Sequence, residues 1–148
     1  MNNHQKNKAI IFDFNRTLFN PETDTLMPFA KEILEHCIQS YDCYLISYDE
    51  GNRKSLLDDL GISRFFKKIA LVSKKTRAHF EEIIKPFRYD AVYVVGDRIK
   101  GEIALGNELH YTTIWYQNGK FATQLPQETY EHPRHTITSL QELIAIIS

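Results

Sequence analysis

Three polar residues, Asp13, Ser47 and Asp97, each stand at the end of a short apolar run. Apolar runs of this kind are typical of inner strands of a parallel sheet. Ligands of such sheets lie beyond the carboxyl ends of the strands, so we expect these side chains to meet at one edge. Two carboxylates there would repel each other unless a cation lay between them. Mg²⁺ suits this position, because it takes one or two protein carboxylates and completes its shell with water and substrate phosphate.

A lysine from the pair Lys74-Lys75 would neutralise further phosphate charge at that edge. A nucleophilic carboxylate, a metal, a hydroxyl and a cation together make a phosphoryl-transfer site. Each residue also has a structural interpretation. An aspartate after a strand often caps a helix, and Glu102 could be an acid in the first turn of a helix, where the helix dipole stabilises it.

The rest of the chain alternates strands and helices. Strands are expected over residues 9–12, 43–46, 69–72, 91–95 and 112–116, with a short one at Ile137. Helices are expected over residues 28–38, 52–60, 75–84, 102–109 and 140–147. Residues 15–25 are expected to be a turn-rich loop, and Asn118-Gly119 is a tight-turn signal. Strands separated by helices predict right-handed crossovers and a parallel sheet covered on both faces.

Composition predicts a globular protein of one domain. The 148 residues are 43% hydrophobic and 25% charged, with a formal net charge of −1. That balance gives no overall attraction to nucleic acid or to an anionic membrane. Cys37 and Cys43 fall in apolar segments and are expected to be reduced core thiols. Residues 1–7 form a polar tail without a signal-peptide core, and no run approaches the ~20 apolar residues of a membrane helix. These features indicate a cytoplasmic protein.

The strand ends carry a specific resemblance. Residues 10–18, with sequence IIFDFNRTL, resemble the first motif of the haloacid dehalogenase-like (HAD) superfamily. Residues 45–47 resemble the second motif, 74–80 the third and 94–103 the fourth, and 136–143 resemble the family's last strand and helix. The resemblance implies one HAD-like domain over residues 1–148. Its α/β fold would be three-layered and Rossmann-like, with a central parallel sheet, helices on both faces and no cap domain.

The same resemblance implies a role for each matching residue. Asp13 would attack phosphorus and become a transient aspartyl phosphate. Asp13, the backbone carbonyl of Asn15 and the side chain of Asp97 would bind Mg²⁺, and Glu102 would orient the groups around the metal.

Two further residues would bind the phosphoryl group. Ser47 would donate a hydrogen bond to its oxygens, and Lys74 or Lys75 would hold Asp13 and the phosphate in place. The family's lysine usually precedes a phenylalanine by six residues, and Phe80 therefore favours Lys74.

The first motif departs from the family pattern at two positions. Asn15 stands where family phosphatases have the aspartate that protonates the leaving group and then activates water. An amide cannot exchange that proton, and loss of an acid/base group usually costs ~10²–10⁴ in rate. The sequence therefore leaves open a slow Mg²⁺-dependent phosphomonoester hydrolase, a phosphatase with another acid, and a non-catalytic module that binds Mg²⁺ and a phosphorylated ligand or partner. Arg16 replaces the usual glycine and would either reach a second anionic group or lie in solvent.

The spacing between motifs leaves no room for an inserted cap, which would need ~40 residues to hold a core. The site is therefore expected to be open. By resemblance an open site suggests a macromolecular substrate or a partner subunit acting as a lid. The phosphorylated substrate, small molecule or macromolecule, and the formation of a homo-oligomer stay open. Dehalogenation by attack of Asp13 on carbon is a weaker alternative, because it usually needs an enclosed pocket.

Overall fold

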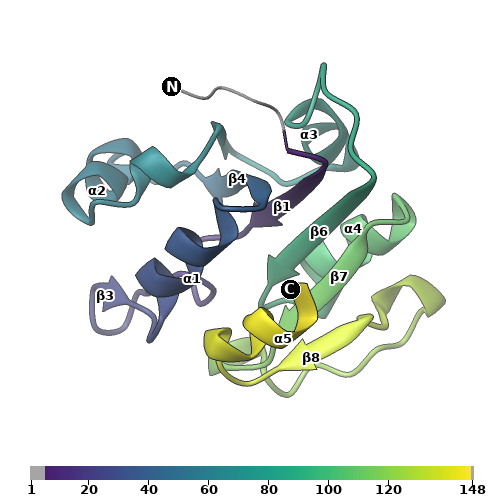
Figure 1. The fold of residues 1–148 in the computed structure, drawn as a ribbon. Coiled ribbons are helices and arrows are strands. Elements are labelled where there is room, and N and C mark those ends of the chain that lie inside the picture. Colours follow the sequence, from purple (N-terminus) through teal and green to yellow (C-terminus); the bar gives the residue numbers. More distant parts are fainter. Residues whose placement is uncertain (1–5, 148) are drawn as a thin grey trace.

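The computed structural model describes residues 6–147, and a six-stranded parallel sheet forms its centre (Figure 1). The strand order is β5-β4-β1-β6-β7-β8, and every neighbouring pair is parallel. The strands are β1 (Lys8–Phe12), β4 (Tyr41–Tyr48), β5 (Lys68–Val72), β6 (Ala91–Gly96), β7 (Thr112–Tyr116) and β8 (His135–Ile137). The parallel sheet predicted from the sequence is confirmed, and its first strand lies at the centre.

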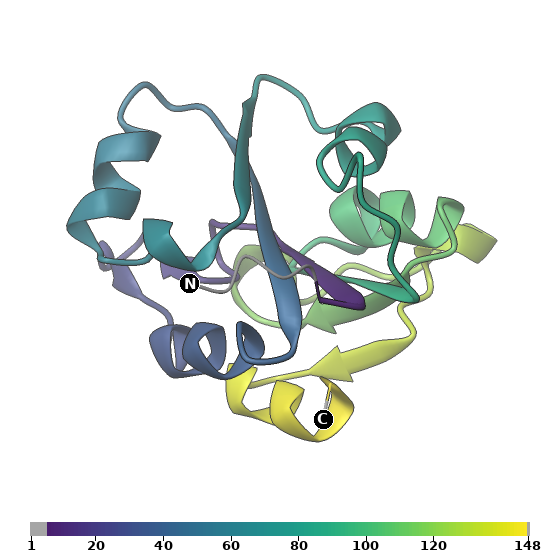
Figure 2. The same cartoon turned by 45° about the horizontal axis from the view of Figure 1, so that its top comes forward.

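Helices cover both faces of the sheet. They are α1 (Ala30–Cys37), α2 (Arg53–Asp59), α3 (Arg77–Glu82), α4 (Ala104–Glu108) and α5 (Leu143–Ile147). Helices α1 and α5 pack on one face, where α2 also contributes Leu57, and helices α3 and α4 lie on the other face (Figure 2). The result is the three-layer α/β arrangement expected from the alternation of strands and helices.

The core divides according to the two-residue period of the strands. Ile10 and Phe12 of β1 belong to the cluster beneath α1 and α5, whereas Ala9 and Ile11 belong to the cluster beneath α3. All four side chains are at most 1% exposed. Burial on both faces explains why this strand is continuously apolar rather than alternating.

Three large apolar residues in the segments predicted to be helical are exposed, namely Phe29, Ile38 and Ile144. Phe29 is 41% exposed because its backbone is left-handed, with φ at 67°, just before α1 begins. Ile144 in α5 is 40% exposed, and its neighbours Leu143 and Ile147 fill the core. The helices themselves form at the predicted places, although all five are shorter at one or both ends than the sequence suggests.

A small hairpin interrupts the segment expected to be a loop. Strands β2 (Phe19–Asn20) and β3 (Thr25–Leu26) pair antiparallel, with Phe19 opposite Leu26. Phe19 also stacks on Phe14, with ring centroids 4.9 Å apart. The hairpin thus anchors the chain between β1 and α1, next to the residues that follow β1.

The beginning of the chain is described only from residue 6, so most of the polar tail expected over residues 1–7 lies outside the described part. Asn7 is already attached to the fold, because its carbonyl accepts a hydrogen bond from the amide of Asp90, at 2.7 Å. Cys37 and Cys43 are buried free thiols, as expected. Each helix within residues 6–147 is too short or too polar to cross a membrane.

Candidate active site

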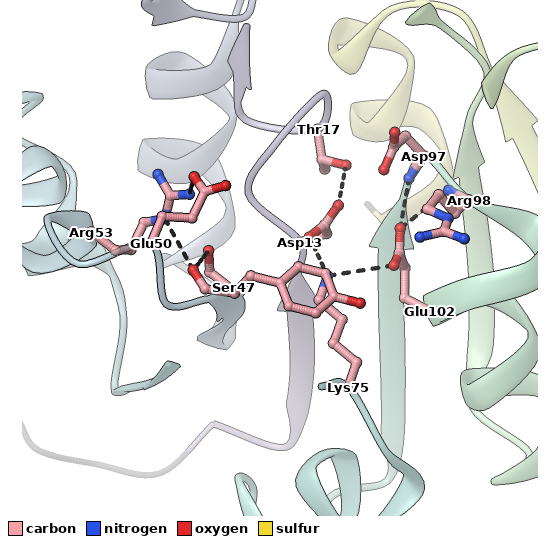
Figure 3. A network of polar contacts seen from close by, with 10 residues as sticks. Asp13, Thr17, Ser47, Glu50, Arg53, Lys75, Asp97, Arg98 and Glu102 are labelled. Carbon is pink, nitrogen blue, oxygen red and sulfur yellow. Dashed lines mark hydrogen bonds and ion pairs between the residues drawn. The ribbon is translucent and has the colours of Figure 1, made fainter. Parts of the chain in front are cut away.

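The polar residues predicted to meet do so at the carboxyl ends of the central strands. Strand β1 lies between β4 and β6, and Phe12 is paired with Leu45 on one side and with Val95 on the other. Asp13 follows directly and donates its backbone N–H to the Val95 carbonyl, at 3.0 Å. The register therefore places Asp13 between the end of β4 and the end of β6 (Figure 3).

Three carboxylates gather at this edge. Asp13, Asp97 and Glu102 each place a carboxylate oxygen within 4.8 Å of the others, and their exposed fractions are 9%, 2% and 2%. Burial, together with the charges of Asp13 and Glu102, raises the pKa of Asp97 to about 10. Burial and the charge of Asp13 also raise the pKa of Glu102. The cluster carries more negative charge than its protein surroundings balance.

Glu102 is held in the cluster by the backbone. Its Oε1 accepts hydrogen bonds from the amides of Asp97 and Arg98, at 3.0 and 3.1 Å. Residues 99–103 form a helical turn, kinked at Gly101, that leads into α4 and directs Glu102 back toward the end of β6. Gly96 leaves the space for this, since a Cβ there would lie 2.1 Å from Cγ of Glu102. Glu102 is therefore part of the carboxylate cluster and does not serve only as an acid in the first turn of a helix.

Lys75 is the cation of the site. Its Nζ pairs with Oδ1 of Asp13 and lies 3.4 Å from Oε2 of Glu102, and its side chain is 6% exposed. Burial alone would lower the pKa of Lys75, but the charges of Asp13 and Glu102 outweigh it and raise that pKa. Lys75 stays charged and offsets one of the three carboxylates.

The choice of Lys74 from motif spacing was therefore wrong. Lys74 is exposed, and no contact with Asp13 is found for it among residues 6–147. The cause is the start of α3, where the Oγ1 of Thr76 accepts a hydrogen bond from the amide of His79, at 3.4 Å. This cap fixes the helix to begin at Arg77, so the residue just before the cap is the one directed into the site.

Ser47 and Asn15 lie at the same place. Both line a pocket of about 150 Å³ together with Asp13, Lys75 and the acids after β6. Ser47 is buried and at present donates its hydroxyl to the carbonyl of Tyr48, at 3.1 Å. Every residue named for the site from the sequence, apart from Lys74, is thus brought together.

Two contributing residues were missed in the sequence. Thr17 is fully buried, and its Oγ1 donates to Oδ2 of Asp13, at 3.4 Å. Arg53 is 2% exposed and supports the loop after β4, donating from Nε to the carbonyl of Tyr48 at 3.4 Å and pairing with Glu50 at 2.5 Å. Thr17 belongs to the first motif, and its place four residues after Asp13 could have indicated a role in the site. Nothing in the sequence marks Arg53 as buried.

The donor set fits a divalent cation such as Mg²⁺. Oδ2 of Asp97 is buried and finds no hydrogen-bond partner among residues 6–147, which is costly unless something binds it. The cluster offers hard oxygen ligands of the kind Mg²⁺ prefers. A divalent ion here would remove the repulsion between the carboxylates of Asp13 and Asp97.

Comparison with known proteins agrees with this geometry. Residues 71–143 match the family model described as HAD-hydrolase-like. This match covers 73 of the 148 residues. The matched segment includes Lys75, Asp97 and Glu102, and the first motif with Asp13 lies ahead of it. No curated protein matches the sequence.

Solved structures of HAD-like proteins share the fold. A candidate HAD-hydrolase from Bacillus subtilis bound to magnesium is 23% identical with a TM-score of 0.70, over 83% of this chain and 56% of that one. The core domain of a candidate phosphoglycolate phosphatase from Streptococcus pneumoniae is 20% identical with a TM-score of 0.69, over 99% and 98%. L-2-haloacid dehalogenase from Xanthobacter autotrophicus with chloropropionic acid covalently bound is 12% identical with a TM-score of 0.72, over 97% and 98%. At these identities the likeness establishes the fold alone.

Two adjacent lysines, Lys74 and Lys75, provide a matched pair of variants. Lys75→Met removes the cation that faces Asp13 and Glu102, and breaking a buried ion pair from one side typically costs about 3–5 kcal/mol. We expect a loss of unfolding free energy of that order in urea denaturation without metal. Lys74→Met should change it by less than about 0.5 kcal/mol, as exposed substitutions do. Equal effects of the two substitutions would contradict the placement of Lys75.

The raised pKa of Asp97 predicts how the stability of the protein depends on pH and on bound metal. Its pKa is raised to about 10 in the folded protein but is near 4 when unfolded, so the folded state keeps a proton that the unfolded state loses. Without metal, this lowers stability as pH rises from about 4 toward 10, by up to about 1.4 kcal/mol per pH unit. Asp97→Asn should therefore melt above the wild type, by a margin that grows from pH 6 to pH 9.

Adding Mg²⁺ at pH 7.5 should reverse that order. The wild-type melting temperature should rise, because a ligand at about 100 times its dissociation constant stabilises by about 2.7 kcal/mol, and Asp97→Asn should gain little. Differential scanning calorimetry with and without the ion measures both effects. An equal Mg²⁺ response in the variant would show that Asp97 does not bind the metal.

Gly96 can be tested against Glu102 in a double-mutant cycle. A methyl group at Gly96 would overlap the Glu102 side chain, and overpacking of this kind typically costs about 1–3 kcal/mol. We expect Gly96→Ala to destabilise the wild type by that amount in urea denaturation. The same change should cost much less in the Glu102→Ala background, where Cγ is absent. An additive cycle would contradict this close packing.

Proposed function

We propose that this HAD-like protein is a magnesium-dependent phosphomonoester hydrolase that acts through an aspartyl phosphate on Asp13. The observation that carries the proposal is the convergence of Asp13, Asp97, Glu102 and Lys75 at the end of β1. A nucleophilic carboxylate beside a lysine and an acidic metal site is the arrangement that phosphoryl transfer needs, since that reaction depends on positioning and charge stabilisation.

Asp13 is oriented for attack by its neighbours. Lys75 contacts Oδ1, and Thr17 donates to Oδ2. The two contacts fix the plane of the carboxylate at the floor of the pocket, which favours in-line attack on a bound phosphoryl group. Lys75 would also offset the charge that the phosphoryl oxygens bring in.

The metal would be held by Asp13, Asp97 and the backbone carbonyl of Asn15, with Glu102 keeping the loop after β6 in place. When bound, Mg²⁺ would screen the charge between the nucleophile and the incoming phosphate. Ser47 would turn its hydroxyl from the carbonyl of Tyr48 to a phosphoryl oxygen, because a hydroxyl group rotates easily to suit its acceptor.

Asn15 determines which step is slow. It lines the pocket beside Asp13, at the place where an acid would protonate the leaving group and later activate water. Formation of the aspartyl phosphate needs no such acid when the leaving group is a stable phenolate. Its hydrolysis still needs an activated water, so we propose that breakdown of the intermediate limits turnover.

Asn15 also favours a second candidate function, a non-catalytic module that binds Mg²⁺ and a phosphorylated ligand or partner. In that case Asp13 would act only as a metal ligand. Dehalogenation, the reaction of one structural neighbour, receives less support from this site. Attack of a carboxylate on carbon needs no cluster of three acids at a metal position.

The hydrolase proposal predicts burst kinetics with p-nitrophenyl phosphate. One equivalent of nitrophenolate per protein should appear quickly in the presence of Mg²⁺, followed by slow turnover. Asp13→Asn and EDTA should each abolish both phases. Stopped-flow absorbance measures the burst, and phosphate release measures the turnover.

Asn15→Asp should raise steady-state turnover by about 10²–10⁴, because it restores the acid/base group. Asn15→Ser is the matched control and should give no gain. If the wild type binds Mg²⁺ but shows no burst on any of a broad panel of phosphomonoesters, the non-catalytic module is the better account.

A further inference from the structure

Three cations surround one aromatic ring at the mouth of the candidate site. Phe121 lies in a short turn, Gly119–Phe121, that follows β7. The guanidinium carbons of Arg98 and Arg16 lie 4.5 and 6.0 Å from its ring centroid, and Nζ of Lys120 lies 5.1 Å from it. These three side chains, Arg16, Arg98 and Lys120, are called the Phe121 cluster below.

The cluster is built by the loops after three neighbouring strands. Arg16 belongs to the loop after β1, Arg98 to the loop after β6, and Lys120 to the loop after β7. Asn118 joins two of these loops, because its Nδ2 donates to the carbonyl of Arg16, at 2.8 Å. The backbone of Arg16 is left-handed, with φ at 60°. The cations are therefore held by the same sheet edge that holds Asp13.

Their charges are poorly balanced by the protein. The Nε atoms of Arg16 and Arg98 are both buried and have no hydrogen-bond partner in the part of the chain that the structure describes. Arg16 pairs with Glu22 at 3.2 Å, but that glutamate side chain is 65% exposed and the pair is screened by water. Within residues 6–147, neither Arg98 nor Lys120 forms an ion pair with a carboxylate. A buried donor without an acceptor is unfavourable, so the protein satisfies these two guanidinium groups only in part.

The cluster faces the nucleophile. Arg16, Arg98, Lys120 and Phe121 line the same pocket of about 150 Å³ as Asp13. Three like charges around one ring repel each other, and attraction to the ring offsets this only in part. An anion placed among them would be attracted by all three. Arginine is well suited to this, because its planar fork matches carboxylate and phosphate oxygens.

We propose that the Phe121 cluster binds a second anionic group of the substrate, so that the substrate is a small phosphomonoester carrying a carboxylate or a further phosphate. The proposal rests on the proposed function only in taking Asp13 as the place where the phosphoryl group binds. The small pocket places the two anionic groups a few bonds apart. Lys75, Ser47 and the metal would hold the group that is transferred, and the Phe121 cluster would select what is attached to it.

Non-hydrolysable phosphonates test this without requiring turnover. Phosphonoacetate and 3-phosphonopropionate carry a carboxylate, and ethylphosphonate and propylphosphonate are their uncharged-tail controls. Isothermal titration calorimetry with Mg²⁺ should show at least one acid binding about tenfold or more tightly than its control, as a charge-assisted contact provides. 1,3-Propylenediphosphonate tests a phosphate-like group in place of the carboxylate. The second anionic group of the substrate is then identified by whichever binds more tightly, the carboxylate-bearing phosphonates or the diphosphonate.

Single variants then locate the preference. Arg98→Gln and Lys120→Gln should each reduce the preference for the acid to within about threefold, while the affinity for propylphosphonate stays at the wild-type value. Lys54→Gln is the matched control, because Lys54 is an exposed lysine of α2 outside the pocket. It should leave both affinities unchanged.

Three results would overturn the proposal. They are equal binding of every acid and its control by the wild type, absence of binding by all five phosphonates, and variants that weaken acid and control equally. The last would mean that the cluster binds the transferred phosphoryl group itself. Failure of the hydrolase proposal is separate, since it appears as a missing burst with p-nitrophenyl phosphate while the preference for acids persists.

Discussion

The site depends on one electrostatic constraint, the burial of three carboxylates against a single lysine. Asp13, Asp97 and Glu102 lie within 4.8 Å of one another, and Lys75 balances only part of their charge. Burying unbalanced charge is unfavourable, and one result is that the pKa of Asp97 is raised to about 10. A divalent ion would supply the missing positive charge. The acids are therefore better understood as a binding site than as a contribution to stability.

The fold supplies this arrangement through its backbone. Parallel pairing of β1 with β4 and β6 brings three strand ends together whatever side chains follow them. Gly96 leaves room for Glu102, and the kinked helical turn over residues 99–103 directs that side chain to the amides at the end of β6. A helix cap at Thr76 turns Lys75 inward. Positive charge around Phe121 then stands beside negative charge around Asp13, which suits a ligand with two anionic ends.

The features of the site that depend on the order of the strands could be predicted from the sequence. The features that depend on the conformation of the loops could not. Asp13, Ser47 and Asp97 could be placed together because each ends an apolar strand, and parallel strands share an edge. Lys75 could not be distinguished from Lys74, because the choice depends on where α3 is capped. The hairpin β2–β3 was missed because its strands have only two residues each. The Phe121 cluster joins three loops far apart in sequence, and only the fold brings them together.

The most direct test of this account is a crystal structure grown with Mg²⁺ and beryllium fluoride, a mimic of the phosphoryl group. The account predicts beryllium bound to a carboxylate oxygen of Asp13, and a magnesium ion at about 2.0–2.1 Å from oxygens of both Asp13 and Asp97. Ser47 and Lys75 should contact the fluorides. A structure in which Asp13 carries no beryllium, with Asp97 too far from it to share an ion, would contradict the account.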